Sequence, residues 1–378
     1  MVLPSLRFNL LLLLALSTCC SVVSFNQNSL QRTELLRRPQ LHLKALPRHQ
    51  MLSLLQPVVG SVIVALLDMV HVVKSLIVQP VLSFFERKTE KGYYESKNVW
   101  ITGASSGIGR ALALELVKLR ANVILSARSR DKLEEVAAEC RLISGDAMVL
   151  VLPVDISVYN QAEAVYSELK GLLSAAGLKA TVDVLVNNAG VSSRGSSLTT
   201  TLSTTEKIMA LNFYGPVAFT KAVLPDMIAN GGGAIGFISS VQGKIGIPSR
   251  SSYAASKHAL QGYCDSLRAE MASSNVSVTV LSPGYVQTEL SLNALNGDGT
   301  KYGVLDATTA SGMKPEQVAA IAARAIARKK EDVVLADLQT ELAIYLKLMF
   351  PSLLSLIMRK RASKEEAKTD NQMVKKLS

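Results

Sequence analysis

Cysteine, histidine and aromatic residues are scarce in this chain of 378 residues: it has four cysteines, four histidines and one tryptophan. Cys19 and Cys20 fall in an apolar leader, and Cys140 and Cys264 fall in separate predicted helices. None has metal-ligand spacing to a histidine. The pattern argues against a disulfide framework and a metal site, so we expect reduced cysteines and no metal.

Acidic residues are also in the minority, because the net charge is +11. Residues 1–95 carry 10 Lys and Arg against 5 Asp and Glu, and residues 341–378 carry 8 against 4, whereas residues 96–340 carry 23 against 21. The nearly neutral middle argues against a nucleic-acid partner. Basic ends beside apolar segments favour an anionic membrane surface instead.

The N-terminal region resembles a targeting leader. In residues 1–25, Arg7 precedes a leucine-rich run that is short for a membrane span, which indicates a signal peptide or signal anchor. Residues 26–50 hold five basic residues and one acid. They form either a basic linker or a transit-like segment, and the second reading would direct the protein to a plastid rather than to the endoplasmic reticulum or another endomembrane.

Residues 51–95 contain an apolar stretch between Pro57 and Pro80, long enough to cross a bilayer. Asp68, His71 and Lys74 interrupt it at helical spacing and give it one polar stripe. We therefore expect a membrane-associating helix that lies in the interface or has its stripe covered. A buried helix of a soluble domain is the alternative.

Between residues 96 and 340 the pattern alternates between short apolar runs and amphipathic segments. This alternation predicts an α/β domain with a doubly wound parallel sheet of seven strands joined by crossover helices. The expected strands are 98–102, 122–126, 148–152, 183–187, 234–239, 276–281 and 332–335. The expected helices are 108–119, 131–140, 159–176, 206–228, one that follows Pro248, and 316–328.

A glycine-rich turn separates the first expected strand from the first helix. Glycines in such a turn permit a tight bend and close approach of the backbone to a pyrophosphate, which the helix N-terminus also attracts. After the second strand, Arg128 stands where an acid would bind the ribose of NAD, and an arginine there favours the 2′-phosphate of NADPH. The turn comprises Gly103, Ser105, Ser106, Gly107, Ile108 and Gly109.

Tyr253 and Lys257 lie four residues apart, which places them on one face of the helix that follows Pro248. An ammonium beside a phenol favours the phenolate, so we expect Lys257 to lower the pKa of Tyr253 from about 10. Such a tyrosine can exchange a proton with a substrate oxygen. Ser240 follows the strand at 234–239 and is expected at the same sheet edge, where ligands bind.

Together these motifs resemble the short-chain dehydrogenase/reductase family, which implies a Rossmann-type fold and NADPH/NADP+ as cofactor. The resemblance implies catalytic roles for Asn212, Ser240, Tyr253 and Lys257. It also implies cofactor contacts at Asp155, Asn187, Ala189, Gly190, Pro283, Gly284, Val286 and Thr288, besides the glycine turn, Arg128, Tyr253 and Lys257. Residues 335–359 resemble more narrowly a membrane-associated branch of the family, the subgroup that contains dehydrogenase/reductase family member 7B.

The resemblance implies reduction of a carbonyl: hydride reaches the carbon, Tyr253 protonates the oxygen, Ser240 holds that oxygen, and Lys257 binds the ribose. Asn212 would fix a water of a proton relay. Residues 285–313 are expected to cover the site, and their apolar residues favour a lipid, steroid or retinoid-like ketone. A phosphate-bearing acyl ketone would need Lys301 or another base. Alternatives are alcohol oxidation with NADP+ and a non-catalytic, cofactor-binding membrane scaffold.

The C-terminal extension, residues 341–361, is apolar and ends in three consecutive basic residues. Pro351 predicts two short helices rather than one span. An exposed extension would contact a membrane or a second copy in a homodimer, and a packed one would be structural. Residues 362–378 are polar and are predicted to be a disordered tail.

Overall fold

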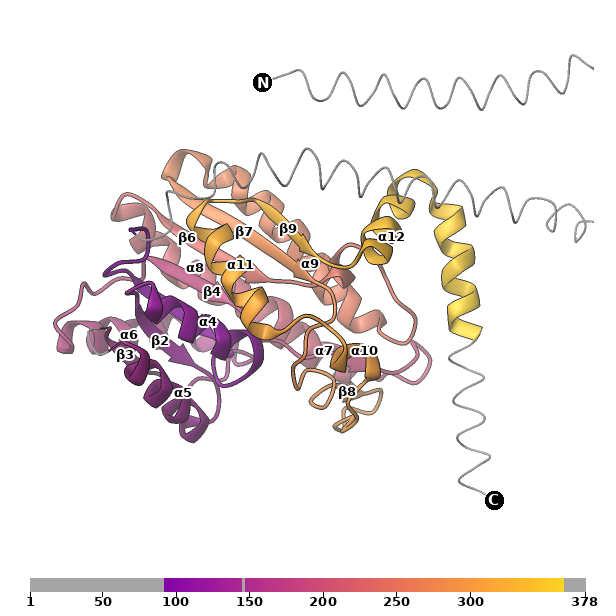
Figure 1. The fold of residues 1–378 in the computed structure, drawn as a ribbon, viewed down its shortest axis with the longest axis horizontal. Coiled ribbons are helices and arrows are strands. Elements are labelled where there is room, and N and C mark those ends of the chain that lie inside the picture. The colour runs from indigo at the N-terminus through magenta and orange to yellow at the C-terminus, as the bar shows by residue number, and fades with distance from the viewer. Residues whose placement is uncertain (1–91, 145–146, 364–378) are drawn as a thin grey trace, which may run out of the picture. The chain divides into compact units, whose positions relative to one another are not determined.

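The computed structural model describes residues 92–144 and 147–363 (Figure 1). The predicted leader, the transit-like segment and most of the predicted membrane-associating segment therefore lie outside the described residues, as does the polar tail from residue 364. The division of the chain into the domains expected above remains a prediction.

A seven-stranded, all-parallel sheet forms the centre of the fold, with the order β3-β2-β1-β4-β6-β7-β9. This confirms the predicted doubly wound sheet. The strand order reverses between β1 and β4, so their carboxyl ends border the crevice in which such sheets bind ligands. The strands are β1 (Asn98–Thr102), β2 (Asn122–Ser126), β3 (Val149–Val151), β4 (Val184–Asn187), β6 (Gly233–Ile238), β7 (Val276–Pro283) and β9 (Asp332–Leu335).

Helices cover both faces of the sheet, as parallel strands with apolar residues on both sides require. One apolar core lies under α4 (Gly107–Lys118), α5 (Arg130–Ile143) and α11 (Pro315–Ala327). The other lies under α6 (Ala162–Ala175), α8 (Gly215–Ala229) and α9 (Ser251–Glu270). Figure 1 shows α4 and α11 in front of the strands. Burial on both faces fixes the strands, and with them the loops at their carboxyl ends.

The single helix predicted over 206–228 is interrupted in the structure. It begins as α7 (Leu202–Met209), passes through a π-helical turn, η3 (Ala210–Tyr214), and continues as α8. Pro216 explains the interruption, because it has no N–H to donate to the carbonyl of residue 212, as an α-helix would require. The wider turn carries Asn212, which is fully buried.

A small second sheet, which the sequence pattern did not predict, pairs β5 (Ser193–Arg194) with β8 (Leu295–Asn296). It ties the chain after β4 to the segment between β7 and α11. That segment, expected to cover the site, also contains α10 (Ala307–Ala310), and a bridge from Val286 to Met313 closes it. Both strands are two residues long, which is too short for an alternating pattern to be visible in the sequence.

Two helices follow β9, as Pro351 predicted: α12 (Leu338–Met349) and a helix over 351–363 (Figure 1). Leu346 and Leu354 are buried and pack with Ile245. Tyr345, Leu348, Met349, Phe350, Leu356 and Ile357 are exposed. One side of the extension is thus packed and another is open. No helix among the described residues is long and apolar enough to span a bilayer.

Candidate active site

The glycine-rich turn has a backbone that only glycine adopts without strain. Gly103 and Gly107 have φ angles of +67° and +54°, in the left-handed region. A Cβ atom on Gly109 would lie 2.2 Å from the carbonyl oxygen of Gly103. These three glycines therefore bring the turn close to the first turn of α4.

Asn188 holds the glycine turn from the neighbouring strand. Its Nδ2 donates to the carbonyl oxygens of Thr102 and Gly103, at 3.0 Å each, and its N–H donates to the Thr102 hydroxyl at 3.1 Å. The sequence reads Asn-Asn-Ala-Gly over residues 187–190, directly after β4. Three of these four residues were assigned a cofactor contact from the sequence, and Asn188 was not. The motif pointed to a function for these residues, but it could not show that Asn188 contacts the glycine turn, which lies 85 residues earlier in the chain.

The other members of that motif also line the crevice. Asn187 donates from Nδ2 to Thr220 Oγ1 at 3.0 Å, while its buried Oδ1 has no hydrogen-bond partner among the described residues. A Cβ on Gly190 would lie 3.2 Å from Asn212 Oδ1 and 3.5 Å from Lys257 Nζ. The backbone of Gly190 therefore passes close to two of the candidate catalytic side chains, with little room for a Cβ.

The glycine turn and Arg128 fit the phosphates of a dinucleotide. Ser106 is exposed, and as the N-cap of α4 its side chain caps no backbone N–H. Helix N–H groups and a free hydroxyl suit a phosphate. Ser105 and Ile108 are half-buried in the same turn, and Arg128 is exposed. The described residues offer the Arg128 side chain no hydrogen bond or ion pair, so it is available to a ligand.

Asp155 is half-buried and already engaged, because its Oδ1 accepts from the N–H and the hydroxyl of Ser157 at 3.0 and 2.7 Å. Across the crevice, Gly284 donates its N–H to the Leu335 carbonyl at 2.8 Å. The Thr288 methyl lies 3.0 Å from where a Cβ of Gly107 would be. The segment from Pro283 through Val286 to Thr288 is thereby brought against the glycine turn, as a site shared by these segments requires.

Tyr253 and Lys257 lie on α9 and are buried, each 4% exposed. Ser240 follows β6 and makes a side-chain hydrogen bond with Tyr253; its hydroxyl also accepts the N–H of Gln242 at 3.1 Å. Lys257 donates from Nζ to the Ile238 carbonyl at 2.9 Å. The structure thus brings together the serine, tyrosine and lysine that the sequence placed at this sheet edge.

The expected effect of Lys257 on Tyr253 is wrong for this structure. Burial raises the pKa of Tyr253, against the lowering effects of the Ser240 hydrogen bond and of Arg250 and Arg194. Burial also lowers the pKa of Lys257 to about 8. The lysine Nζ lies 5.9 Å from the phenol ring centroid and bonds to a carbonyl oxygen instead. Desolvation, which disfavours both charged forms, outweighs the attraction expected from their spacing.

Asn212 joins three parts of the site from the π-helical turn. Its Oδ1 accepts the N–H of Val191 at 2.8 Å, and its Nδ2 donates to the Val191 carbonyl at 2.9 Å and to Ser256 Oγ at 3.0 Å. Both ends of the amide are therefore occupied by protein groups. The side chain fixes the end of the Asn-Asn-Ala-Gly motif against α9.

Beside Tyr253 lies a charged cluster that the sequence analysis missed. Arg194 Nε and Nη2 bond to Asp306 Oδ2 at 3.1 and 2.5 Å, and Arg250 Nη2 lies 3.4 Å from the same oxygen. Both arginine side chains are 12% exposed.

Tyr285 lies near this cluster and hydrogen-bonds with Arg361 of the C-terminal helix. Burial alone would raise the pKa of Tyr285, but Arg250 and Arg361 lower it overall. Lys301, the base considered from the sequence, is exposed.

Known proteins resemble this chain over most of the described fold. The family model "short chain dehydrogenase" matches residues 97–297. The "Dehydrogenase/reductase SDR family protein 7-like" of Anopheles gambiae is 44% identical over 293 residues, 76% of this chain and 90% of that protein. The "Dehydrogenase/reductase SDR family member 7B" of Danio rerio is 44% identical over 290 residues, 76% and 93% of the two chains.

Solved structures show the same fold. A short chain dehydrogenase/reductase from Burkholderia phymatum in complex with NAD has a TM-score of 0.60 at 23% identity, over 69% of this chain and 96% of that one. A short-chain dehydrogenase from Sphingobium yanoikuyae in complex with NADPH has a TM-score of 0.55 at 27% identity, over 63% and 87%. The first likeness is one of fold alone. The two cofactors differ, so these neighbours do not decide between NAD and NADP.

Proposed function

The chain belongs to the short-chain dehydrogenase/reductase family and is similar to its member 7B proteins, and on that basis we propose that it is an NADPH-dependent reductase of an apolar ketone. The observation that carries the proposal is the buried group of Ser240, Tyr253 and Lys257 beside the glycine turn. A lipid, steroid or retinoid-like ketone fits the apolar residues of the covering segment.

When bound, NADPH supplies a hydride to the carbonyl carbon. Ser240 donates a hydrogen bond that orients the carbonyl oxygen, and Tyr253 gives its phenol proton to that oxygen as it becomes an alcohol. Lys257 holds the ribose, and Asn212 keeps the wall of the site against α9. The glycine turn and Ser106 would hold the pyrophosphate, and the segment from Pro283 to Thr288 would hold the carboxamide. Oxidation of an alcohol uses the same groups in reverse.

Tyr253→Phe tests the reaction, because it keeps the ring and removes the proton. We expect turnover to fall by roughly 10²–10⁴-fold, the usual contribution of a positioned acid, with folding and cofactor affinity retained. The measurement is NADPH consumption against a panel of lipid, steroid and retinoid ketones. Tyr263→Phe, on the same helix, is the matched control. Equal turnover in wild type and a folded Tyr253→Phe protein would contradict the mechanism. If the wild type neither reduces the ketones nor oxidises the corresponding alcohols, the result favours the non-catalytic, cofactor-binding membrane scaffold.

The preference for NADPH rests on the exposed, unpaired guanidinium of Arg128. Arg128→Ala is expected to weaken NADPH binding by roughly 10- to 100-fold, the equivalent of about 1.5–3 kcal/mol for a charge-assisted hydrogen bond, and to leave NADH binding unchanged. Arg130→Ala, also exposed and two residues away, controls for the loss of charge. Equal wild-type affinity for the two cofactors would contradict the preference.

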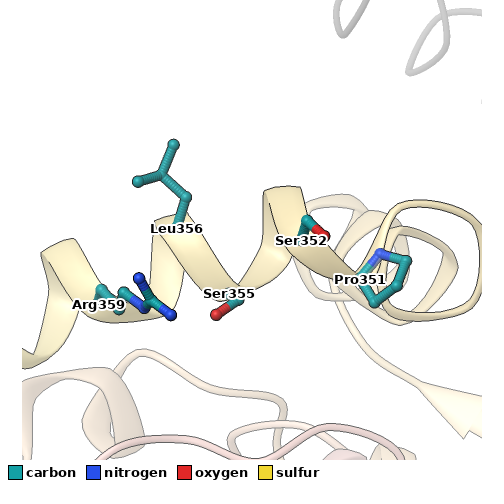
Figure 2. A pocket seen from close by; sticks show the side chains of 5 residues that line it. All are labelled: Pro351, Ser352, Ser355, Leu356 and Arg359. Carbon is teal, nitrogen blue, oxygen red and sulfur yellow. The ribbon is translucent and has the colours of Figure 1, made fainter.

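The C-terminal helices support a proposed contact with an anionic membrane surface. In the second helix, the exposed Leu356 and Ile357 come shortly before the exposed Arg359 and Lys360 in the sequence. Figure 2 shows Pro351 at the start of the second helix and Leu356 projecting from it, beside a hollow that Arg359 also lines. Apolar area combined with basic charge binds anionic lipid. An endomembrane location, with a plastid as the alternative, remains part of this proposal.

Vesicle flotation tests the membrane contact. The substituted residues are exposed, so that the variants leave the packed side of the helices intact. We expect the full chain to float with anionic vesicles and less with zwitterionic ones, and Leu348→Glu combined with Phe350→Glu to reduce flotation. The alternative occupant of this surface is a second copy of the chain in a homodimer. Sedimentation without lipid tests it: if the wild type is a dimer and the double variant is a monomer, the surface is a dimer contact.

A further inference from the structure

Two buried glutamines lie close to the candidate catalytic residues. Gln242 belongs to a 3₁₀ turn, η4 (Val241–Gly243), that follows Ser240, and Gln261 lies in α9 one helical turn after Lys257. The two glutamines are 6% and 7% exposed. Glutamine is seldom buried to this degree, because its amide must then find hydrogen-bond partners inside the protein. The two residues can therefore be compared by how their amides are paired.

The amide of Gln261 is fully paired within the protein. Its Nε2 donates to the hydroxyls of Ser239 and Ser282 at 3.1 and 2.9 Å. Its Oε1 accepts a hydrogen bond from Lys244 Nζ at 2.8 Å. Both hydrogens of the amide nitrogen and the amide oxygen thus have partners. These contacts join the end of β6 and strand β7 to α9, so Gln261 is a structural residue.

Gln242 differs, because its buried Oε1 has no hydrogen-bond partner among the described residues. Its backbone is nevertheless fixed, since its N–H donates at 3.1 Å to Ser240 Oγ, the hydroxyl that is hydrogen-bonded with Tyr253. The next residue, Gly243, packs so closely on α9 that a Cβ there would lie 2.9 Å from the Lys257 carbonyl oxygen. The turn that carries the unpaired oxygen is thus held against the candidate catalytic serine and against the helix of the candidate catalytic lysine.

A buried amide oxygen without a donor costs free energy, so native proteins pair such an atom with a ligand or an ordered water when the fold offers no donor. The two cations near the turn are already engaged. Lys244 Nζ bonds to Gln261 and to Asp332. Lys257 Nζ bonds to a main-chain carbonyl. The donor for the Gln242 oxygen is therefore expected to come from a bound molecule.

We propose that Gln242 is a specificity-determining residue, whose amide oxygen accepts a hydrogen bond from a hydroxyl group on the carbon next to the substrate carbonyl. The inference rests on the proposed function and narrows its substrate to an apolar α-hydroxy ketone. In that mechanism Ser240 orients the carbonyl oxygen, and Gln242 begins from the same turn, two residues further on. Its amide therefore reaches a substituent beside the carbonyl and not the far end of an apolar chain.

The test uses two probes, 1-hydroxy-2-decanone and 2-decanone, which differ by one hydroxyl group. A site with a buried acceptor discriminates against a ketone that leaves the acceptor unpaired, so we expect kcat/KM of wild type with NADPH to favour the hydroxy ketone by about tenfold or more. Gln242→Met keeps the approximate shape and removes the acceptor, and it is expected to bring this ratio close to one. Titration calorimetry of both ketones on the NADP+-loaded protein gives the corresponding ratio of affinities without turnover.

Gln261→Met is the matched control, because it removes an equally buried amide whose partners all belong to the protein. It is expected to lower stability and to leave the ratio as in wild type. No preference in wild type, or an unchanged ratio in Gln242→Met, would overturn the inference in favour of an ordered water as the partner of the amide. If Gln242→Met does not fold, Gln242→Asn decides, since it withdraws the oxygen by one methylene: a lowered ratio supports the inference, and an unchanged one overturns it.

The inference and the proposed function fail in different ways. If neither ketone is reduced, but calorimetry shows the preference for the hydroxy ketone and its loss in Gln242→Met, the inference is supported and the proposed reaction is not. If wild type and Gln242→Met reduce both ketones with the same ratio, the reaction is supported and the inference is overturned.

Discussion

The glycine turn after β1 and the two helices after β9 are held in opposite ways. The turn has a backbone that side chains would obstruct, and Asn188 bonds to it from the next strand. Among the described residues, the C-terminal helices make no main-chain hydrogen bond to the strands. They pack through a small apolar cluster around Leu346, Leu354 and Ile245, with side-chain contacts from Lys347 and Arg361 beside it. A special backbone geometry requires particular residues at fixed positions, so it is visible as a sequence motif. Packing through one side of a helix requires only apolar residues, and these do not show which side is buried. The turn could therefore be identified from the sequence alone, and the C-terminal face could not.

The largest effect is expected where the turn is tightest. Gly109→Ala places a Cβ against the Gly103 carbonyl oxygen, and such overpacking costs about 3 kcal/mol of unfolding free energy. Cofactor binding should be lost with it. Gly171→Ala is the matched control, since a Cβ there meets nothing within 4 Å. Replacing this helix glycine is expected to raise the free energy of unfolding by up to about 1 kcal/mol. Urea unfolding measures both; equal stability of the two variants would show that the turn is not tight.

The stability of the C-terminal helices is expected to depend on the side chains of their packed side and not on those of their exposed side. Leu346→Ala removes a side chain that is 7% exposed and is expected to cost about 2 kcal/mol, the lower range for a buried leucine. Leu348→Ala removes one that is 73% exposed and is expected to cost less than about 0.5 kcal/mol. The two are compared by urea unfolding and by hydrogen exchange of α12. Similar losses would contradict the one-sided packing.

The buried Lys257 predicts a pH dependence of stability. Its folded pKa of about 8 lies below the usual lysine pKa of 10.5, so between these values the unfolded chain binds more protons and stability rises with pH. Lys257→Met lacks this dependence. The stability of wild type minus that of Lys257→Met is therefore expected to rise by roughly 1–2 kcal/mol from about pH 7.5 to about pH 9.5. Urea unfolding at intermediate pH values gives the difference, and a flat or falling curve would contradict the burial of an ammonium.

The smallest effect is expected at a polar contact of the C-terminal helices. Lys347 Nζ lies 2.6 Å from the Lys244 carbonyl oxygen and 3.0 Å from His258 Nε2. These contacts are exposed, so Lys347→Met is expected to cost about 0.5 kcal/mol, against no measurable change in Lys360→Met. Thermal unfolding compares them. A loss as large as that of Leu346→Ala would show that polar contacts, and not the apolar cluster, hold the extension.

The sheet and the position of the site could be predicted because their signals are local. Strand alternation with helices gave the seven parallel strands, and Pro351 gave the break between the last two helices. What the sequence did not show depends on residues far apart in the chain. Asn188 contacts a turn near residue 103, and Arg194, Arg250 and Asp306 meet from three separate segments. The protonation of Tyr253 was mispredicted for the same reason, since spacing reports proximity and not burial.

The π-helical turn at Ala210–Tyr214 acts as a phase adjustment in a long helix. An α-helix advances about 100° per residue, and a turn that holds one extra residue delays the next segment by that angle. Ile208 before the turn and Phe219, Val223 and Met227 after it are all buried. In a strict α-helix Ile208 and Phe219 would lie only about 20° apart, so the wider turn offsets the buried side of α7 from that of α8 by about 100°. Deletion of one residue in this turn would therefore leave the relative phase of α7 and α8 unchanged, but it would remove the widened backbone turn that carries Asn212.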